Sequence, residues 1–277
     1  IYYGRHDASK SPIAQVRGAW EIMQKLHVPV EFINELDLNL EILKQFKVVI
    51  LPNVTILTPP QVAAIRQYVR EGGSLLATFE TGLYDQYGER GNDFSLADVF
   101  GLSYKGVESV AFPRGTIISP GQDLLTHLQD TLVPRQDNSI FISAPYAITK
   151  PIEGITKAIC WAVEVTDPSP LPLVRSKPSD IPAVHVNRFG KGKAAYISLD
   201  LFKMYPFLQS QPGSTTAFSG GMSLYFNVKG WMADLIGEMV DWLAPNPPIR
   251  TEGASLLACT FFEQKEKNRL IVHLYNP

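Results

Sequence analysis

Residues 72–82 read Gly72-Gly73-Ser74-Leu75-Leu76-Ala77-Thr78-Phe79-Glu80-Thr81-Gly82, and this stretch decides the fold. It predicts the end of a helix, a buried strand and a sharp turn. Gly72 and Gly73 can adopt the left-handed conformation that closes a helix, and residues 74–79 form an apolar run typical of a strand covered on both faces. Ligands and catalytic groups gather at the carboxyl ends of such strands in doubly wound α/β folds, so Glu80 lies where a nucleophile would be displayed.

Short apolar runs alternate with helical patterns on the N-terminal side of this stretch. Ser11-Pro12 predicts the start of one helix, and Thr58-Pro59-Pro60 predicts the start of the helix that ends at Gly72. Strands are predicted at residues 1–3, 30–34, 48–51 and 75–79, with a short helix at residues 38–46. Short connections between such elements imply right-handed crossovers. We therefore predict an α/β protein of flavodoxin-like type, with a mainly parallel sheet and helices on both faces.

The composition excludes several classes of protein. The chain has 277 residues, is 45% hydrophobic and carries a net charge of −2, as an ordinary globular protein does. Its basic residues are scattered and no apolar run is long enough to span a bilayer, so we expect neither a nucleic-acid partner nor a membrane partner. Cys160 and Cys259 lack any CxxC or Cys/His pairing, so no metal site is expected.

The two ends of the sequence predict a piece cut from a longer protein. Residues 1–3 read as a strand already in progress, and the chain stops just after another apparent strand at residues 270–275. No signal peptide is present, but in such a piece its absence says little about location. We expect a soluble protein whose compartment, cytoplasmic or secreted, the sequence leaves open.

Beyond Gly82 the predicted elements become shorter and more varied. Residues 94–100 predict a short helix, residues 204–222 an irregular aromatic-rich segment, and residues 223–243 a long amphipathic helix. Added antiparallel strands, separated by Pro, Gly and Asn turns, are expected at residues 107–112, 115–118, 140–146 and 157–165. Residues 182–199 predict a hairpin.

A proline-rich segment at residues 244–248 predicts a domain boundary, because proline neither continues a helix nor donates to a sheet. We therefore expect one domain over residues 1–247. Residues 248–277 would form a C-terminal β-hairpin, with strands at residues 255–262 and 268–275. Since a hairpin is marginal alone, it would either start a further β domain or pack on the main body.

Three runs, taken in order, carry a family resemblance. They are Val48-Val49-Ile50-Leu51-Pro52, Tyr68-Val69-Arg70-Glu71-Gly72-Gly73-Ser74-Leu75-Leu76-Ala77-Thr78, and Gly190-Lys191-Gly192-Lys193-Ala194-Ala195-Tyr196-Ile197-Ser198. The set resembles the class I glutamine-amidotransferase-like domain that follows the catalytic barrel in family 42 β-galactosidases and related glycoside hydrolases, where it is called the trimerisation domain. The resemblance covers residues 1–244, and His273-Leu274-Tyr275-Asn276-Pro277 is similar to the start of the C-terminal β domain of those enzymes.

This resemblance implies partners and a role. The partners would be a catalytic barrel domain of the same longer chain, further copies in a homo-oligomer such as a trimer, and carbohydrate near the interface. The domain would serve oligomerisation and shape a neighbouring carbohydrate active site. It would use no cofactor and would not be catalytic alone.

The residues depart from true amidotransferases at both catalytic positions. Those enzymes carry a cysteine in a Gly-x-Cys-x-Gly elbow and a His-x-Glu pair after a later strand. Here the elbow position matches Glu80, with Gly82 two residues on, and the later site falls at Ser198-Leu199-Asp200 without a histidine. Glu80 cannot replace a thiolate in forming a glutamyl thioester, and nothing relays the proton. We expect a degenerate elbow and no glutaminase activity.

Other residues keep a second class of function open. Glu80 with Asp85 has the residue types of a glycosidase carboxylate pair, and His6 and Asp7 would line the same cleft. Together these residues are consistent with a free-standing hydrolase that has a cleft around Glu80, Asp85 and His6. The alternative is a structural role for Glu80, in an ion pair with an arginine or on backbone amides. His185 is predicted to be a half-exposed strand residue and not a base.

Two further patterns have plain interpretations. Gly190-Lys191-Gly192 joins strand to strand and lacks the spacing of a phosphate loop, so it predicts a hairpin turn. The aromatic residues within residues 204–222 would stack on a sugar in a sugar-binding module, or else cover the core or an interface.

The loop at residues 81–93 is the predicted contact surface. It leaves the carboxyl end of a central strand, where clefts form, and carries Tyr84, Asp85, Tyr87 and Arg90 between glycines. Interfaces favour Tyr and Arg as anchors because each combines a large contact area with a polar end. We predict that the loop reaches a partner domain or subunit and helps to wall a sugar pocket. The alternative is a mobile connector.

Overall fold

The computed structural model describes residues 13–108, 116–120, 140–142, 145–152, 156–165, 176–209, 228–245 and 258–275. Its α-helices are α1 (Ile13–Lys25), α2 (Leu40–Leu43), α3 (Pro59–Glu71), α4 (Ala97–Phe100), α6 (Leu201–Gln209) and α7 (Val228–Leu243). Its strands are β1 (Val48–Leu51), β2 (Ser74–Thr78), β3 (Leu102–Glu108), β4 (Thr116–Pro120), β5 (Ile140–Ile142), β6 (Tyr146–Pro151), β7 (Thr156–Val165), β8 (Ser176–Phe189), β9 (Gly192–Ile197), β10 (Ala258–Gln264) and β11 (Arg269–Tyr275). Short 3₁₀ turns lie at Glu35–Asp37 and Lys265–Lys267.

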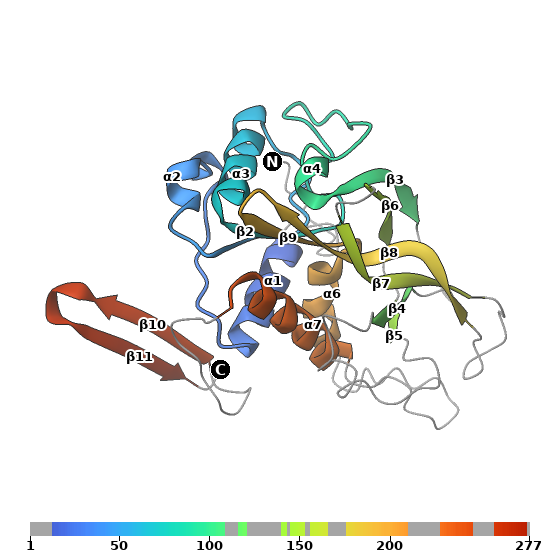
Figure 1. The fold of residues 1–277 in the computed structure, drawn as a ribbon. Helices are drawn as coiled ribbons and strands as arrows, with labels where there is room; N and C mark the ends of the chain where they lie inside the picture. The colour runs from blue at the N-terminus through green and yellow to red at the C-terminus, as the bar shows by residue number, and fades with distance from the viewer. Residues whose placement is uncertain are drawn as a thin grey trace, which may run out of the picture.

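A seven-stranded sheet runs through the described residues in the order β1-β2-β9-β8-β7-β4-β5. β1, β2 and β9 are parallel neighbours, and the strands from β8 to β5 continue the sheet in antiparallel fashion. α1, α6 and α7 cover one face of the parallel part, and α3 and α4 cover the other (Figure 1). The predicted α/β class, with added antiparallel strands and a C-terminal β-hairpin, is confirmed.

β2 is the central strand of the parallel part, and all five of its residues are buried. Leu75 and Ala77 belong to the core under α3, whereas Leu76 belongs to the core under α1, α6 and α7. The preceding helix α3 begins at a capping box, in which the Thr58 N–H donates to Gln61 Oε1 at 2.9 Å. It ends at Gly72, whose φ of 121° suits glycine alone, as the sequence predicts.

Several predicted elements are wrong in detail. Residues 30–34 form no strand in the structure, since this short apolar run pairs with no strand among the described residues. The helix predicted at residues 38–46 shrinks to α2, which Asn39 caps through its side chain. α6 occupies the start of the segment predicted to be irregular, despite Pro206 inside it. The strand predicted at residues 1–3 lies outside the described residues.

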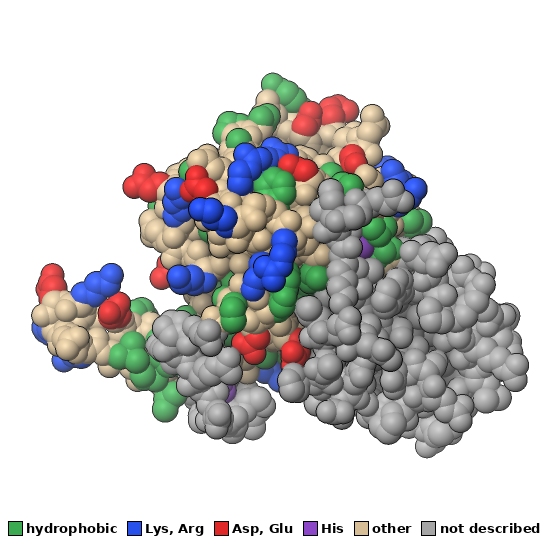
Figure 2. All heavy atoms as spheres, in the orientation of Figure 1, with side chains coloured by type: hydrophobic (Ala, Val, Ile, Leu, Met, Phe, Trp, Pro, Cys, Tyr) green, Lys and Arg blue, Asp and Glu red, His purple; other side chains and the backbone are tan. Residues whose placement is uncertain are grey.

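Two smaller sheets complete the described structure. β3 and β6 form one antiparallel pair, and the N–H of Ala147 in β6 donates to Ser198 O at 2.8 Å, which joins this pair to the end of β9. β10 and β11 form a hairpin that projects from the main body (Figure 1). Figure 2 shows apolar side chains along this hairpin and charged ones near its tip. Within the described part of the chain, no helix is long and apolar enough to cross a membrane.

Close approach of α1 and α6 depends on Gly18. A Cβ atom at this position would lie 1.8 Å from the backbone oxygen of Phe202, so neither helix could keep its place. Gly237 in α7 is a contrasting case, because a Cβ there would meet only the end of the Leu26 side chain, at 3.1 Å.

We predict that Gly18→Ala lowers the free energy of unfolding by about 2–3 kcal/mol, because the added methyl group forces the two helices apart. Urea unfolding followed by circular dichroism measures this. The matched control is Gly237→Ala, which we expect to change stability by less than about 1 kcal/mol, since a flexible side chain yields and alanine favours the helix. Equal effects of the two substitutions would contradict the proposed packing constraint.

Candidate functional site

The carboxyl ends of β1, β2 and β9 meet at one edge of the sheet and are joined by side chains. Asn53, after β1, accepts the Glu80 N–H through Oδ1 at 3.2 Å and donates from Nδ2 to Asp200 Oδ2 at 3.5 Å. Gln15 of α1 donates from Nε2 to the same Asp200 oxygen at 3.4 Å. The Asn53 N–H donates to Thr78 Oγ1 at 2.9 Å. These contacts connect α1 with the ends of three parallel strands.

The sharp turn after β2 centres on Phe79 and not on Glu80. Phe79 has a φ of 51°, in the left-handed region that large side chains rarely adopt. The Tyr196 hydroxyl donates to the Phe79 carbonyl, and Thr81 Oγ1 donates to Thr78 O at 2.7 Å. The left-handed residue of the turn is thus Phe79, one residue before the Glu80 that the sequence assigns to the elbow position. A buried phenyl ring stands where the strained turn would display a nucleophile.

Glu80 and Asp200 are the two acidic groups of this edge. Glu80 is half-buried, and burial raises the pKa of its carboxyl, although the positive charge of Arg90 opposes the shift. Asp200 is 4% exposed. Burial raises the pKa of Asp200 from 3.8 to about 6, against the lowering effects of Lys203 and the Gln15 hydrogen bond. Each carboxylate is thus costly to ionise in its present place.

Asp85 has a different task from Glu80. Its Oδ1 accepts the backbone N–H groups of Tyr87 and Glu89, both at 2.9 Å, and the residue is exposed. This use of a carboxylate shapes a turn, so Asp85 supports the loop instead of facing Glu80 across a glycosidic bond. His6 and Asp7 lie outside the described residues. In the described ranges, no three His, Cys, Asp or Glu side chains gather so as to hold a metal ion.

The loop at residues 81–93, which we call the contact loop, is ordered by its own backbone. The N–H groups of Gly82 and Tyr84 donate to Val54 O at 2.9 Å and Thr55 O at 3.0 Å, which ties the loop to the segment after β1. Tyr84 also forms an antiparallel bridge with Arg90. These backbone contacts tie the base of the loop to the segment after β1 and tie its two arms to each other.

The side chains of the contact loop divide into inward and outward groups. Arg90 lies over the Tyr104 ring at 5.1 Å and donates from Nη2 to the Tyr104 hydroxyl at 2.6 Å. Tyr84 is half-buried, whereas Tyr87 is 81% exposed. The structure therefore brings Glu80, Tyr84, Arg90 and Tyr104 to the base of the loop and leaves Tyr87 at its tip.

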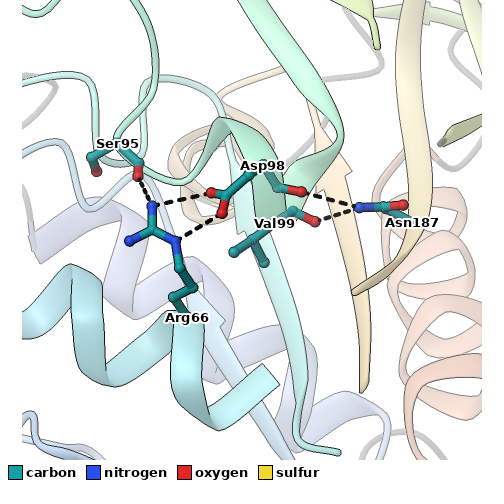
Figure 3. A network of polar contacts seen from close by, with 5 residues as sticks. All are labelled: Arg66, Ser95, Asp98, Val99 and Asn187. Carbon is teal, nitrogen blue, oxygen red and sulfur yellow. Dashed lines mark hydrogen bonds and ion pairs between the residues drawn. The ribbon is translucent and has the colours of Figure 1, made fainter. Parts of the chain in front are cut away.

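A polar network fixes the chain where it leaves the contact loop (Figure 3). Arg66 of α3 holds both carboxylate oxygens of Asp98, at 2.8 and 3.1 Å, and donates to Ser95 O at 2.8 Å. Asn187 of β8 donates from Nδ2 to Val99 O at 2.8 Å. The bidentate Arg66–Asp98 pair joins α4 to α3, and the Asn187–Val99 hydrogen bond joins α4 to β8.

His185 is buried and not half-exposed, so the sequence prediction of its exposure is wrong. Alternation with Val184 and Val186 predicts that one face of β8 is exposed to solvent. In the structure β6 lies against this strand, and His185 is buried. Burial lowers the pKa of His185 to about 3, which keeps the imidazole neutral. It is a core residue of the described sheet.

Sequence reasoning missed three residues of this site. Asn53 carried a signal, because an Asn directly after an apolar strand and Pro52 is typical of a functional or capping position. Gln15 and Tyr104 carried none: Gln15 lies 185 residues before Asp200 in the chain, and Tyr104 lies on β3, 14 residues after Arg90.

The chain is similar to known proteins both in sequence and in fold. Residues 4–206 match the family described as the β-galactosidase trimerisation domain. An α-L-fucosidase isoenzyme 2 from Paenibacillus thiaminolyticus has a similar fold, with a TM-score of 0.66 and 14% identity over 94% of this chain and 34% of that one. The β-galactosidase of Rahnella sp. R3 gives a TM-score of 0.59 and 16% identity, over 89% of this chain and 29% of that one.

A third similar structure is the β-galactosidase from Bacillus circulans sp. alkalophilus, with a TM-score of 0.54 and 15% identity. It is matched over 71% of this chain and 26% of its own. The present chain thus spans between 26% and 34% of the length of these three solved proteins. At identities of 14%, 15% and 16%, the similarity to these structures establishes the fold alone.

The raised pKa of Asp200 predicts how the stability of the fold depends on pH. Its folded pKa of about 6 lies above the ordinary value of 3.8, so the folded state binds the proton more tightly than the unfolded state does. The contribution of Asp200 to stability therefore falls as pH rises from about 4 to about 6 and stays low above that range. Two pKa units set an upper limit of about 3 kcal/mol.

We predict that Asp200→Asn raises the free energy of unfolding by about 1–2 kcal/mol at neutral pH and has little effect near pH 4, where the native carboxyl is neutral. Urea unfolding at both pH values measures this. Asp37→Asn, in an exposed 3₁₀ turn, is the control. A loss of stability in Asp200→Asn at neutral pH would show that the charged form is preferred and would overturn the assignment.

Proposed function

This chain belongs to the family of β-galactosidase trimerisation domains, and we propose that it is the assembly domain of a longer glycoside hydrolase of β-galactosidase type. The family match over residues 4–206 is the observation that carries the proposal. Its partners are a catalytic barrel domain of the same longer chain and further copies of that chain. The domain holds subunits together and shapes a neighbouring carbohydrate site without performing the reaction.

The contact loop is the anchor of assembly in this proposal. Backbone hydrogen bonds to Val54 and Thr55 hold it in place, and it presents Tyr87 to solvent. A large aromatic side chain on a firm protrusion loses little conformational freedom when it docks. This preorganisation supports a role in contact over a role as a connector.

In a trimer with threefold symmetry, the contact loop must bind a surface of the next copy that is different from the loop itself. Closed threefold assemblies use head-to-tail interfaces, so the contact loop of one copy meets a different surface of the next. The tip of the loop therefore does not have to fit against the same loop of another copy. Tyr87, with Ile56 exposed at the base of the loop, supplies apolar area for one side of such an interface.

The base of the contact loop is proposed to wall a sugar pocket. Arg90 and Tyr104 stack there, and Glu80 and Tyr84 lie beside them. Aromatic faces with a few placed charged groups are the chemistry with which proteins bind small polar ligands. In the assembled enzyme this wall faces carbohydrate that the barrel domain binds.

We also propose that residues 248–277 begin a further β domain, separate from the domain over residues 1–247. The β10–β11 hairpin supports this division, since it exposes Phe262, Leu270, Val272 and Leu274. A two-stranded hairpin with such side chains gains stability only when other strands or a neighbouring domain cover it.

The assembly role predicts the behaviour of Tyr87→Ala in the full-length protein. Truncation of an exposed anchor removes contact with the next copy and is expected to cost about 2 kcal/mol, or roughly a 30-fold rise in the Kd of the oligomer. Sedimentation velocity over a concentration series measures this. The isolated domain should keep its melting temperature, because Tyr87 makes little contact with its own chain.

Phe32→Ala is the matched control for that measurement. Phe32 is 65% exposed and lies outside the contact loop, so its truncation should leave the oligomer unchanged. If Tyr87→Ala and Phe32→Ala sediment like the wild type, the loop is only a connector.

The same proposal predicts that the 277-residue chain alone turns over neither glutamine nor aryl β-galactosides. The reason is that Phe79 occupies the elbow and Asp85 supports a turn. Release of ammonia and of nitrophenol measures the two reactions. Turnover that disappears in Glu80→Gln would favour the free-standing hydrolase instead.

A further inference from the structure

Lysine and arginine side chains gather around the β8–β9 turn and the end of α3. They belong to Lys44, Lys47, Arg70, Arg188, Lys191 and Lys193, and we call this surface the basic face. Backbone contacts bring its parts together: the Lys191 N–H donates to Arg70 O at 2.9 Å, and the Ser74 N–H donates to Lys47 O at 3.2 Å. Figure 2 shows Lys and Arg side chains over this region. The whole chain has a net charge of −2, so the basic face is a local concentration of positive charge.

The acidic group within the basic face is Glu71, and its charge is already shared. Lys44 holds its carboxylate at 2.6 Å, and Gln67 donates to it at 2.8 Å. Arg188 and Lys191 are exposed, and neither side chain forms a salt bridge or a hydrogen bond within the ranges that the structure describes. These two side chains are therefore available to an acidic partner.

The β8–β9 hairpin keeps Arg188 at a local cost. Arg188 lies directly opposite Lys193 in the register of the two strands, and like charges in such a pair destabilise a hairpin. Lys193 is compensated, because its Nζ donates to Trp242 O at 2.6 Å and lies over the Trp242 ring at 5.0 Å. Arg188 has no such acceptor among the described residues. A local rule broken in this way is typical of a functional surface.

The contact loop carries the opposite charge. Residues 81–93 contain the acidic residues Asp85, Glu89 and Asp93 and one basic residue, Arg90. Arg90 is bound to Tyr104 at the base of the loop. At the tip, Asp85 and Glu89 are exposed on either side of Tyr87, which is 81% exposed. The tip thus presents an aromatic ring flanked by negative charge.

We propose that the basic face receives the contact loop of the next copy of this chain. The inference rests on the proposed role of the loop in oligomerisation, and it names the second surface that a head-to-tail contact requires. Arg188 and Lys191 attract Glu89, and Tyr87 packs beside Phe189, which is half-buried in the basic face. Opposite charges on the two surfaces orient the encounter, whereas two contact loops repel each other.

The test is a charge-reversal cycle in the full-length protein, measured by sedimentation velocity over a concentration series. Lys191→Glu and Glu89→Lys each place like charges together, so each alone should raise the Kd of the oligomer about tenfold. The double variant restores opposite charges, and its Kd should return to within about threefold of the wild type. Glu89 suits this exchange, because its backbone N–H bonds to the Asp85 carboxylate and holds the turn whatever its side chain.

A matched control and a salt series accompany the cycle. Lys267→Glu reverses one charge at the turn of the β10–β11 hairpin, outside the basic face, and should leave the Kd unchanged. Raising the salt concentration from about 0.1 M to about 1 M shortens the screening length from about 10 Å to about 3 Å. The Kd of the wild-type oligomer should therefore rise across this range.

The outcomes separate this inference from the assembly role. An oligomer that is absent under every condition would overturn the assembly role itself. An oligomer that is unaffected by Lys191→Glu and Glu89→Lys, or a double variant no tighter than the weaker single variant, would overturn the receiving surface alone. If Lys191→Glu does not fold, Arg188→Glu takes its place in the cycle. A wild-type Kd that does not change with salt would contradict the proposal without any variant.

Discussion

Burial of β2 on both faces is the constraint on which the rest of this structure depends. Leu75 and Ala77 point into one core and Leu76 into the other, so the strand is stable only with helices on each side. α3 supplies one cover, and α1, α6 and α7 supply the other. With both faces closed, the ends of the strand are what remains for function, and the polar chain through Asn53, Glu80 and Asp200 lies at one of them.

Much of this fold could be predicted from the sequence, because the patterns that indicate its elements lie within a few neighbouring residues. The apolar run at residues 74–79, the cap at Thr58 and the turn at Gly190 each predict their element from a few neighbouring residues. The prediction of a strand at residues 30–34 fails for the converse reason, since a short apolar run does not by itself supply a partner strand among the described residues. Likewise α6 forms through packing against α1, which an aromatic-rich segment containing Pro206 does not reveal.

The site was predictable in position and not in detail. Glu80 follows a buried strand, which places it at the carboxyl edge from sequence alone. The left-handed conformation of Phe79 and the meeting of Gln15, Asn53 and Asp200 depend on contacts between distant segments. In an amidotransferase such a turn displays a nucleophile. Here the same backbone geometry, held by Tyr196 and Thr81, redirects the chain into an ordered loop.

The projecting hairpin has a consequence for how the protein is made. β10 and β11 pair only with each other in the described part of the chain, so the outer edge of each strand offers unpaired N–H and C=O groups. Edges of this kind recruit strands from other chains, and the exposed Leu270, Val272 and Leu274 strengthen that tendency. Charged residues occur near the tip, at Glu263 and Lys267, where they discourage stacking, but the base of the ribbon has no such protection. A ribbon left uncovered in this way is prone to pair with strands of other chains while the protein is being synthesised.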